Sequence, residues 1–496
     1  MRKSVAVAIL VLIFAIVLGG RLFFALQTDD FSYSAYYDLR QIEHIKETGK
    51  PLYQDELSYG GRTHIFSPFF YYFLSLFTLF MPVTLVAKII PNLLASLTVF
   101  IIYVITYELT QKEWPSLISA FFSGFLLVFF AKTINAISPH TLVLPLIFLF
   151  AYCFLKMDKP NYLYISLILI LLLVLTHIVV FILILALLIY FLIAKLENFQ
   201  PSPKGLELLL FLTFLVFWFD FILYKKAFLV HGGSVIWQNT PIQILSSYFT
   251  NITVLQTVYA IGLVPLIFGV FAVYHNFFEK KQRSTHLFIG FALASFLLLW
   301  FKLITLDLGL MFLGLVLAIL AGIGMKLMAD YFNKTRFPKA GPTLVVVLLV
   351  LFVFTSVLPL LSAVTVEMKD RPDYAEKEAL LWLRNNTPND AVVLATLKEG
   401  YAVNYFANRK NVIDSNFLMI PLIEQRYDDV NLIFTTPFKT DAVRKLNEYG
   451  VTHIFFSPLA RQQYNITKIA YIDDPECFTL LYNGEVKIYS VQCRIS

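Results

Sequence analysis

The chain has 496 residues, of which 58% are apolar and only 15% are charged, and its mean hydropathy is +0.72. A soluble domain carries about 25% charged residues, so this composition excludes a water-exposed surface over most of the chain and indicates an integral membrane protein. The net charge of +6 does not indicate a nucleic-acid-binding protein, because many basic residues fall in short connections between apolar segments.

Apolar segments long enough to cross a bilayer, which takes about 20 residues, recur from the N-terminus onward. The opening MRKSVAVAILVLIFAIVLGGRLFFAL has a basic start, a long apolar stretch and no cleavage site, so we expect an uncleaved helix with a cytoplasmic N-terminus. The run over 161–196 is split at the polar pair Thr176-His177. The predicted spans are 4–26, 66–82, 84–109, 115–132, 138–155, 161–176, 177–196, 205–224, 252–275, 285–301, 304–329 and 341–363.

The loop charges do not fit this count of segments. Basic residues of the predicted cytoplasmic loops are Lys156, Lys159, Lys195, Lys204, Lys280, Lys281, Arg283, Lys334, Arg336 and Lys339. Their alternation places Lys156 inside, whereas counting from a cytoplasmic N-terminus places it outside. Either a crossing is hidden between 66 and 155 or one segment there is a half-helix. Both alternatives place the residues after 363 outside, with about 11 to 13 transmembrane helices.

The last part of the chain changes character, and we expect a transmembrane domain over 1–363 followed by a water-soluble, extracytoplasmic α/β domain over 364–496. EMKDRPDYAEKEALLWLRNNTPNDAVVLATL predicts a helix, a turn and a strand, GVTHIFFSP a buried strand, and CFTLLYNGEVKIYSV a hairpin around Asn483-Gly484. Cys477 and Cys493 could form a disulfide in that compartment. Segments 27–65 and 225–251 are too polar to span and are predicted as external loops on the same side.

The first external loop concentrates groups that a transfer reaction needs. A carboxylate can accept a proton from an acceptor hydroxyl, and an arginine can hold a phosphate through its planar fork. A solvated loop with ordinary surface charges is the alternative interpretation. The loop carries the acids Asp29, Asp30, Asp38, Glu43, Asp55 and Glu56, the cations Arg40, Lys46, Lys50 and Arg62, and His44 and His64.

The order of residues in this loop resembles that of a known family. DLRQIEHIKETGKPLYQDELSYGGR, followed by SPFFYYFLSLF, is similar to the first external loop of GT-C membrane glycosyltransferases, especially archaeal relatives of the oligosaccharyltransferase catalytic subunit. A second match, LKEGYAVNYFANRKNVIDSNF, is similar to the Trp-Trp-Asp-Tyr-Gly motif of oligosaccharyltransferases and the stretch after it. The resemblance implies a GT-C fold over nearly the whole chain. The matching residues are Tyr36, Tyr37, Arg40, Gly49, Pro51, Pro68, Gly400, Tyr401, Asn408, Arg409, Val412, Asp414 and Asn416.

The departures from that family bear on its chemistry. The position of the catalytic Asp falls on Ser34, while Asp29 and Asp30 look like the acid pair of the protein-mannosyl and aminoarabinose transferase branch, which makes one of them the expected base. Leu397, Lys398 and Glu399 replace Trp-Trp-Asp, so no sequon pocket is expected.

The acids that bind a divalent metal in oligosaccharyltransferases are missing from AKTINAISPH, and the Glu of a later external loop falls on Gln238. A hard cation would then have too few oxygen ligands, so we expect no metal and no other cofactor.

We therefore predict a metal-independent membrane glycosyltransferase of the cell membrane. It would move a sugar from a polyprenyl-phosphate donor to a lipid, glycan or protein acceptor on the outer face. His177, at a helix break, is either a satisfied buried residue or faces the donor. A catalytically inactive GT-C scaffold or lipid-binding protein is the alternative, and a transporter is a second one, against which the few charges inside the helices argue. The predicted base is Asp29 or Asp30, the predicted phosphate ligands are Arg40, Arg62, His177 and Lys302, and the predicted acceptor or cavity residues are Asp38, Glu56, His64, Gln238, Glu399 and Tyr401.

Overall fold

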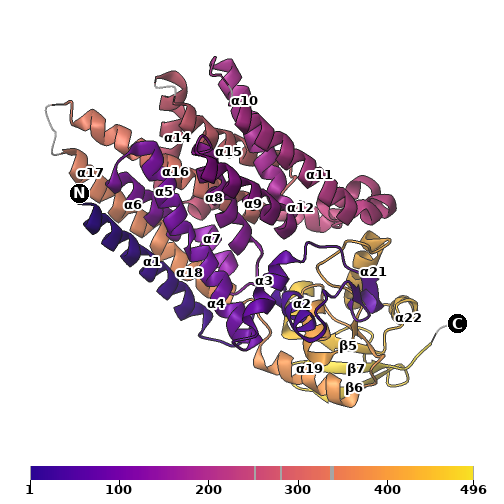
Figure 1. The fold of residues 1–496 in the computed structure, drawn as a ribbon. Helices are drawn as coiled ribbons and strands as arrows, with labels where there is room; N and C mark the ends of the chain where they lie inside the picture. Colours follow the sequence, from indigo (N-terminus) through magenta and orange to yellow (C-terminus); the bar gives the residue numbers. More distant parts are fainter. Residues whose placement is uncertain (1, 201, 251–252, 280–281, 336–339, 495–496) are drawn as a thin grey trace. The chain divides into compact units, whose positions relative to one another are not determined.

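The chain divides into two compact units in the computed structural model, which describes residues 2–200, 202–250, 253–279, 282–335 and 340–494 (Figure 1). Unit 1 comprises Met1–Asp29, Ser67–Leu223 and Tyr248–Lys369, and unit 2 comprises Asp30–Phe66, Tyr224–Ser247 and Asp370–Ser496. Unit 2 thus joins most of both predicted external loops to the C-terminal segment. The predicted domain boundary at 363 remains a prediction. Lys280, Lys281, Arg336 and Lys339 of the predicted cytoplasmic loops lie outside the described residues.

Unit 1 is built from helices, two of which, α11 and α12, continue across the division between the units. The helices are α1 (Lys3–Ala25), α3 (Phe69–Phe77), α4 (Val83–Ser96), α5 (Thr98–Thr110), α6 (Glu113–Gly124), α7 (Leu127–Ile134), α8 (His140–Leu155), α9 (Pro160–Thr176), η2 (Ile178–Val180), α10 (Phe181–Leu196), α11 (Pro203–His231), α12 (Ile242–Thr250), α13 (Val254–Ile261), α14 (Leu263–Phe278), α15 (Arg283–Trp300), α16 (Leu306–Phe332), α17 (Ala340–Phe352), η4 (Val353–Val357) and α18 (Leu358–Lys369).

Helix α16 forms the centre of unit 1. Its most apolar 18-residue stretch is 94% buried, as expected of a helix that is surrounded by other helices. It packs against α5, α6, α14 and α15. A close approach to α14 requires glycine at position 324, since a Cβ there would lie 2.3 Å from the carbonyl oxygen of Phe268.

The described helices account for the predicted membrane segments, with one difference in the first half. Seven helical stretches are long and apolar enough to cross a membrane, and two bent helix pairs raise the number to nine. Two shorter apolar helices, α8 and α9, have 16 and 17 residues and correspond to two further predicted spans. The segment predicted over 66–82 is only the nine-residue α3, which at 1.5 Å per residue is about 13 Å long and cannot cross a core of about 30 Å. This geometry favours the half-helix alternative.

Unit 2 contains a five-stranded sheet of order β4-β3-β5-β7-β6. β3 pairs in parallel with β4 and β5, whereas β7 is antiparallel to β5 and β6. The helix–turn–strand, the buried strand and the Asn483-Gly484 hairpin predicted from sequence are α19 and β3, β5, and β6–β7. The sheet strands are β3 (Val392–Leu394), β4 (Lys410–Asn411), β5 (His453–Phe456), β6 (Phe478–Asn483) and β7 (Lys487–Val491).

The remaining elements of unit 2 cover this sheet or belong to the two loops. They are α2 (Ala35–Thr48), β1 (Gln54–Asp55), η1 (Ser58–Gly60), β2 (Arg62–Thr63), η3 (Gly232–Trp237), α19 (Tyr374–Asn386), α20 (Gly400–Ala402), η5 (Val403–Ala407), α21 (Ile423–Thr435), α22 (Lys439–Glu448) and α23 (Pro458–Tyr464).

Helix α19 has a defined beginning because Asp373 and Glu376 form a capping box. The Asp373 side chain accepts a hydrogen bond from the Glu376 amide at 2.7 Å, and Glu376 accepts one from the Asp373 amide at 3.3 Å. Its buried face, which includes Leu380 and Leu383, packs with Phe455 of β5 and Ile488 of β7. The sheet therefore fixes the place of the first turn of α19, which matters for the site below.

A disulfide closes the end of unit 2, where Cys477 and Cys493 are joined with their Cα atoms 4.6 Å apart. The link ties the start of β6 to the residues after β7 and closes a loop with a sequence separation of 16. Cys153 in α8 is buried and free.

We predict that Cys493→Ser lowers the free energy of unfolding of unit 2 by about 2–4 kcal/mol, because a cross-link over a loop of this length restricts the unfolded chain. Thermal unfolding of the full chain with and without reductant would show it. Reductant should destabilise the wild type and the Cys153→Ala control, but not Cys493→Ser; equal sensitivity in all three would contradict the prediction.

Candidate functional site

The predicted acid pair lies at the start of the first predicted external loop, and the structure gives its two members different surroundings. Asp29 is exposed at the end of its unit 1 segment. Asp30 is half-buried in unit 2, and both of its carboxylate oxygens accept hydrogen bonds from Lys377 Nζ of α19, at 2.8 and 2.9 Å. Lys377 thus fixes the Asp30 side chain, and sequence reasoning did not single it out.

The residues after Asp30 are held by the same turn of α19. Tyr33 Oη donates to Glu376 Oε2 at 2.5 Å. The nearby Glu399 carboxyl is 1% exposed and accepts hydrogen bonds from the amide and the hydroxyl of Thr396, at 2.9 and 2.6 Å. Burial raises the pKa of Glu399, although hydrogen bonds from Ser457 and Thr396 oppose this. Glu399, a predicted cavity residue, is therefore a buried part of unit 2.

Two predicted site residues, Arg40 and His64, are joined by Asp55. The Arg40 guanidinium donates to both Asp55 oxygens at 2.7 and 2.9 Å, and His64 Nε2 lies 3.3 Å from Asp55 Oδ2. Burial by itself would raise the pKa of Asp55, but hydrogen bonds and charges from His64 and Arg40 lower it far below its ordinary value. Burial, followed by the charge of Arg62, lowers the pKa of His64. The cluster holds β1 and α2 together.

A second buried cluster is centred on Asp414, which is 0% exposed. Its Oδ1 accepts from Arg62 Nη2 at 3.2 Å, and its Oδ2 accepts from Ser58 Oγ at 2.6 Å and Asn411 Nδ2 at 3.2 Å. Tyr59 Oη donates to the Asp414 carbonyl oxygen at 2.5 Å. The two stretches that carry the family resemblance therefore meet in unit 2.

Both arginines of the first loop are thus engaged inside unit 2. Arg62 also donates to the carbonyl oxygen of Asn416, and its side chain is 2% exposed. Tyr401 is buried, with its ring centroid 5.4 Å from that of Tyr37. This geometry gives no support to a phosphate-binding role for Arg62 or Arg40; both are structural ion-pair partners here.

The second predicted external loop packs on the residues before and within α21. Asn239 Nδ2 donates to the carbonyl oxygens of Phe417 and Ile420 at 3.1 and 3.0 Å, and Gln243 Nε2 donates to Asp428 Oδ1 at 2.9 Å. The predicted cavity residue Gln238 is exposed beside them, in a left-handed conformation with φ 53°.

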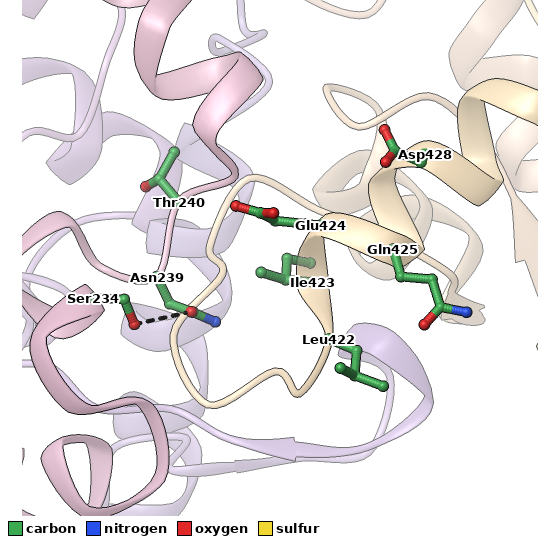
Figure 2. A pocket seen from close by; sticks show the side chains of 8 residues that line it. All are labelled: Ser234, Asn239, Thr240, Leu422, Ile423, Glu424, Gln425 and Asp428. Carbon is green, nitrogen blue, oxygen red and sulfur yellow. Dashed lines mark hydrogen bonds between the residues drawn. The ribbon is translucent and has the colours of Figure 1, made fainter.

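A pocket of about 570 Å³ lies at this junction. Figure 2 shows its lining, with the side chains of Ser234, Asn239 and Thr240 from the loop and those of the α21 segment across from them. Leu422 and Ile423 supply apolar surface, while Glu424 and Asp428, one helical turn apart, supply carboxylates beside the Gln425 amide. This mixture of acceptors, donors and apolar surface suits an uncharged polyhydroxylated ligand.

The other predicted residues are not gathered by the described contacts. In unit 1, His177 Nδ1 accepts from the Val179 amide at 3.1 Å, and Lys302 Nζ lies 5.4 Å from the centroid of the Phe249 ring. In unit 2, Glu56 is exposed and Asp38 half-buried in the first turn of α2. Among the described residues, no three His, Cys, Asp or Glu side chains are grouped as metal ligands would be. Metal independence itself remains a prediction.

Sequence reasoning also missed a polar cluster inside unit 1. Arg21 of α1 and Lys88 of α4 are 1% and 3% exposed and contact Asn92, Thr133 and Asn135. The signal was present, because a single charge inside an apolar run points to the interior of a helix bundle.

Comparisons with known proteins identify the fold. Neither a family model nor a curated protein matches the chain. Among solved structures, the Archaeoglobus fulgidus oligosaccharyltransferase tethered with an NVT-sequon acceptor peptide is 15% identical, with a TM-score of 0.69 over 92% of this chain and 69% of that one. ArnT from Cupriavidus metallidurans bound to undecaprenyl phosphate is 11% identical, with a TM-score of 0.54 over 99% and 98%. The mycobacterial arabinofuranosyltransferase AftD is 13% identical, with a TM-score of 0.57 over 98% of this chain but 40% of its own.

These three proteins are GT-C glycosyltransferases, and the chain has their fold. With its apolar helices, it is a multi-pass membrane protein that carries a sheet-containing C-terminal part. At these identities the likeness defines the fold alone.

We predict that Asp414→Asn destabilises unit 2 by about 3–5 kcal/mol, because it leaves the buried Arg62 charge without its partner. The exposed Asp441, which pairs with Arg444 one turn away, provides the matched control, and Asp441→Asn should cost no more than about 0.5 kcal/mol. Chemical denaturation of the full chain, followed by limited proteolysis of unit 2, measures both. Equal losses would show that Asp414 is not the centre of this unit.

We predict that the cluster of Asp55, Arg40 and His64 contributes less to the stability of unit 2 as the pH falls, in two ranges. The pKa of His64 in the folded protein is below its ordinary 6.5. As the pH falls below 6.5, the unfolded state therefore binds a proton at His64 before the folded state does, and this favours unfolding. Since the pKa of Asp55 is below its ordinary 3.8, a second loss follows near pH 4 and below. Each proton costs at most about 1.4 kcal/mol per pH unit.

Unfolding measured at intervals from pH 7.5 to 3.5 tests this dependence. His64→Gln should flatten the upper range and Asp55→Asn the lower one. His453, whose pKa burial also lowers, adds a slope of the same sign, so His64→Gln is compared with the double variant His64→Gln/His453→Gln. Burial raises the pKa of Glu376 to about 8 and also raises that of Glu399, which adds slopes of the opposite sign to every variant, so the test is the difference between variants. An upper range with the same slope in His64→Gln as in the wild type would refute the assignment.

Proposed function

We propose that this protein is a membrane glycosyltransferase that moves a sugar from a polyprenyl-phosphate carrier to an acceptor at the outer membrane face. The observation that carries the proposal is the GT-C fold over nearly the full length of ArnT, whose structure holds undecaprenyl phosphate. The disulfide between Cys477 and Cys493 supports an extracytoplasmic place for unit 2, since disulfides persist in oxidising compartments. The N-terminus would then be cytoplasmic.

In this proposal Asp29 is the base and Asp30 is a positioning residue. Lys377 engages both oxygens of Asp30, whereas Asp29, the next residue toward α1, is exposed. Asp29 would accept the proton of the acceptor hydroxyl while that oxygen forms its bond to the anomeric carbon. The bond from the anomeric carbon to the phosphate oxygen breaks with its electron pair, and the polyprenyl phosphate leaves. The step needs no further reactant.

The pocket beside α21 is proposed to select the acceptor. Its two carboxylates accept hydrogen bonds from hydroxyl groups and repel anions, and its amides can donate in return. Glu424 and Asp428 accept hydrogen bonds from Ile242 and Gln243 of the second loop, at 3.4 and 2.9 Å, which holds them in place. We therefore expect a glycan or glycosylated acceptor without negative charge near the reacting group.

One observation favours the alternative of a GT-C scaffold without chemistry. Arg40 and Arg62, the arginines predicted to hold the phosphate, are engaged by Asp55 and Asp414. An inactive relative would keep such pairs for stability alone. The two alternatives differ in what removal of the acid pair does.

We predict that Asp29→Asn reduces transfer by about 10²-fold or more, and that Asp30→Asn has a smaller effect. The measurement is the incorporation of labelled sugar from cell-derived polyprenyl-phosphate sugars by the full chain in lipid nanodiscs. The control is Asp158→Asn, an exposed acid in a predicted cytoplasmic loop, which should transfer as the wild type does.

The scaffold alternative requires that both Asn variants leave the lipid-linked and protein-linked glycans of the source cell unchanged. Solute uptake into vesicles that contain only this protein would instead indicate a transporter. If the variant with both Asp29 and Asp30 replaced by Asn still transfers sugar, the assignment of Asp29 as the base is wrong.

A further inference from the structure

The buried polar cluster of unit 1 lies where three helix ends meet. Arg21 is in the last turns of α1, Lys88 is in the second turn of α4, and Thr133 and Asn135 are at the end of α7. In this set Arg21, Thr133 and Asn135 are each at most 4% exposed. Buried charges are costly in a membrane unit and mark functional positions.

The partners of Arg21 are neutral. Its Nε donates to Asn92 Oδ1 at 3.0 Å, and its Nη2 donates to Thr133 Oγ1 at 2.5 Å. Its Cζ lies 4.7 Å from the centroid of Phe130 and 5.7 Å from that of Phe129. A guanidinium has five N–H donors, and neither of these two acceptors carries a charge that offsets its own.

Asn135 adds an unused donor to the same cluster. Lys88 Nζ donates to Asn135 Oδ1 at 2.5 Å, which fixes the amide orientation because an ammonium has no acceptor to offer. The Asn135 Nδ2 group is then buried without a hydrogen-bond partner, although such groups are normally satisfied. The cluster therefore presents two cationic side chains and an unpaired amide donor.

A neighbouring lysine of unit 1 has acidic partners and provides a comparison for Arg21. Lys132, also on α7, lies 2.6 Å from Glu367 and 3.7 Å from Asp307. It is also half exposed, with 40% of its side chain accessible. Arg21 is buried and has neutral partners instead, so its surroundings differ in kind from those of an ordinary ion pair.

We infer that Arg21, Lys88 and Asn135 form an oxyanion site that binds a phosphate monoester at the α1, α4 and α7 helix ends. An oxyanion supplies an acceptor for the unpaired Asn135 amide donor and a charge opposite to that of Arg21, and charge-assisted hydrogen bonds to phosphate are among the strongest that such side chains make. The site takes the phosphate of a prenyl carrier lipid or free phosphate. The lipid source deepens the proposed function and rests on it, whereas the oxyanion site itself does not.

The test measures binding without sugar or acceptor, so its failure is separate from a failure of transfer. Titration calorimetry of the full chain in nanodiscs compares farnesyl phosphate, farnesol and inorganic phosphate. We expect farnesyl phosphate to bind the wild type at least tenfold more tightly than Arg21→Gln. Arg283→Gln, which removes an arginine of the same unit that donates to Tyr190 Oη at 3.0 Å, should bind as the wild type does.

Asn135→Asp keeps the proposal testable if Arg21→Gln does not fold. It places a carboxylate beside Lys88 and Arg21, so it should raise the thermal midpoint of the ligand-free protein and weaken farnesyl phosphate binding at least tenfold. Inorganic phosphate binding as tightly as farnesyl phosphate would support the oxyanion site and remove the lipid as its source. Farnesol binding as well as farnesyl phosphate, or wild-type affinity in Asn135→Asp, would overturn the site.

Discussion

The carboxylate of Asp414 is the constraint on which the organisation of unit 2 depends. It meets Arg62 and Ser58, which are 352 and 356 residues away in the sequence, and it does so without exposure to water. A buried carboxylate is costly unless its oxygens are fully engaged, and here both oxygens and the residue's carbonyl are hydrogen-bonded. The first predicted external loop is therefore bound to the C-terminal segment by a buried cluster, and loss of any one of its hydrogen bonds would destabilise it.

The position of the acid pair depends on the packing of unit 2. Asp30 and Tyr33 contact Lys377 and Glu376, adjacent residues in the first turn of α19. That turn is fixed by its capping box and by the packing of α19 on the sheet. The start of the loop thus has a defined position, which is what the proposed proton abstraction from an acceptor hydroxyl requires. The sheet contributes to the proposed chemistry by holding the loop, without supplying a catalytic group.

Charge is distributed differently in the two units. In unit 2, the two buried arginines of the first loop meet opposite charges, in the Arg40–Asp55 and Arg62–Asp414 pairs. In unit 1, the buried Arg21 meets an amide, a hydroxyl and aromatic faces. Ion pairs hold a structure together by themselves, whereas a buried cation among neutral groups retains its attraction for an anion. Arg62 and Arg21 therefore differ in what surrounds the same guanidinium group.

The sequence by itself determined the membrane class, most helices, and β3, β5 and the β6–β7 hairpin of the C-terminal part, because hydropathy and turn residues act locally. The GT-C fold was implied by the resemblance of two motifs to that family. The sequence also located the acid pair, Arg40, Arg62 and Tyr401. Only the tertiary structure decided the partners: that Lys377 engages Asp30, that Arg40 and Arg62 are occupied by Asp55 and Asp414, and that Arg21 and Lys88 share a cluster with Asn135. The physical reason is that the sequence shows the charge and hydrogen-bonding groups of a side chain but not its neighbours. Whether that side chain is available to a ligand depends on which groups the fold brings within hydrogen-bond distance.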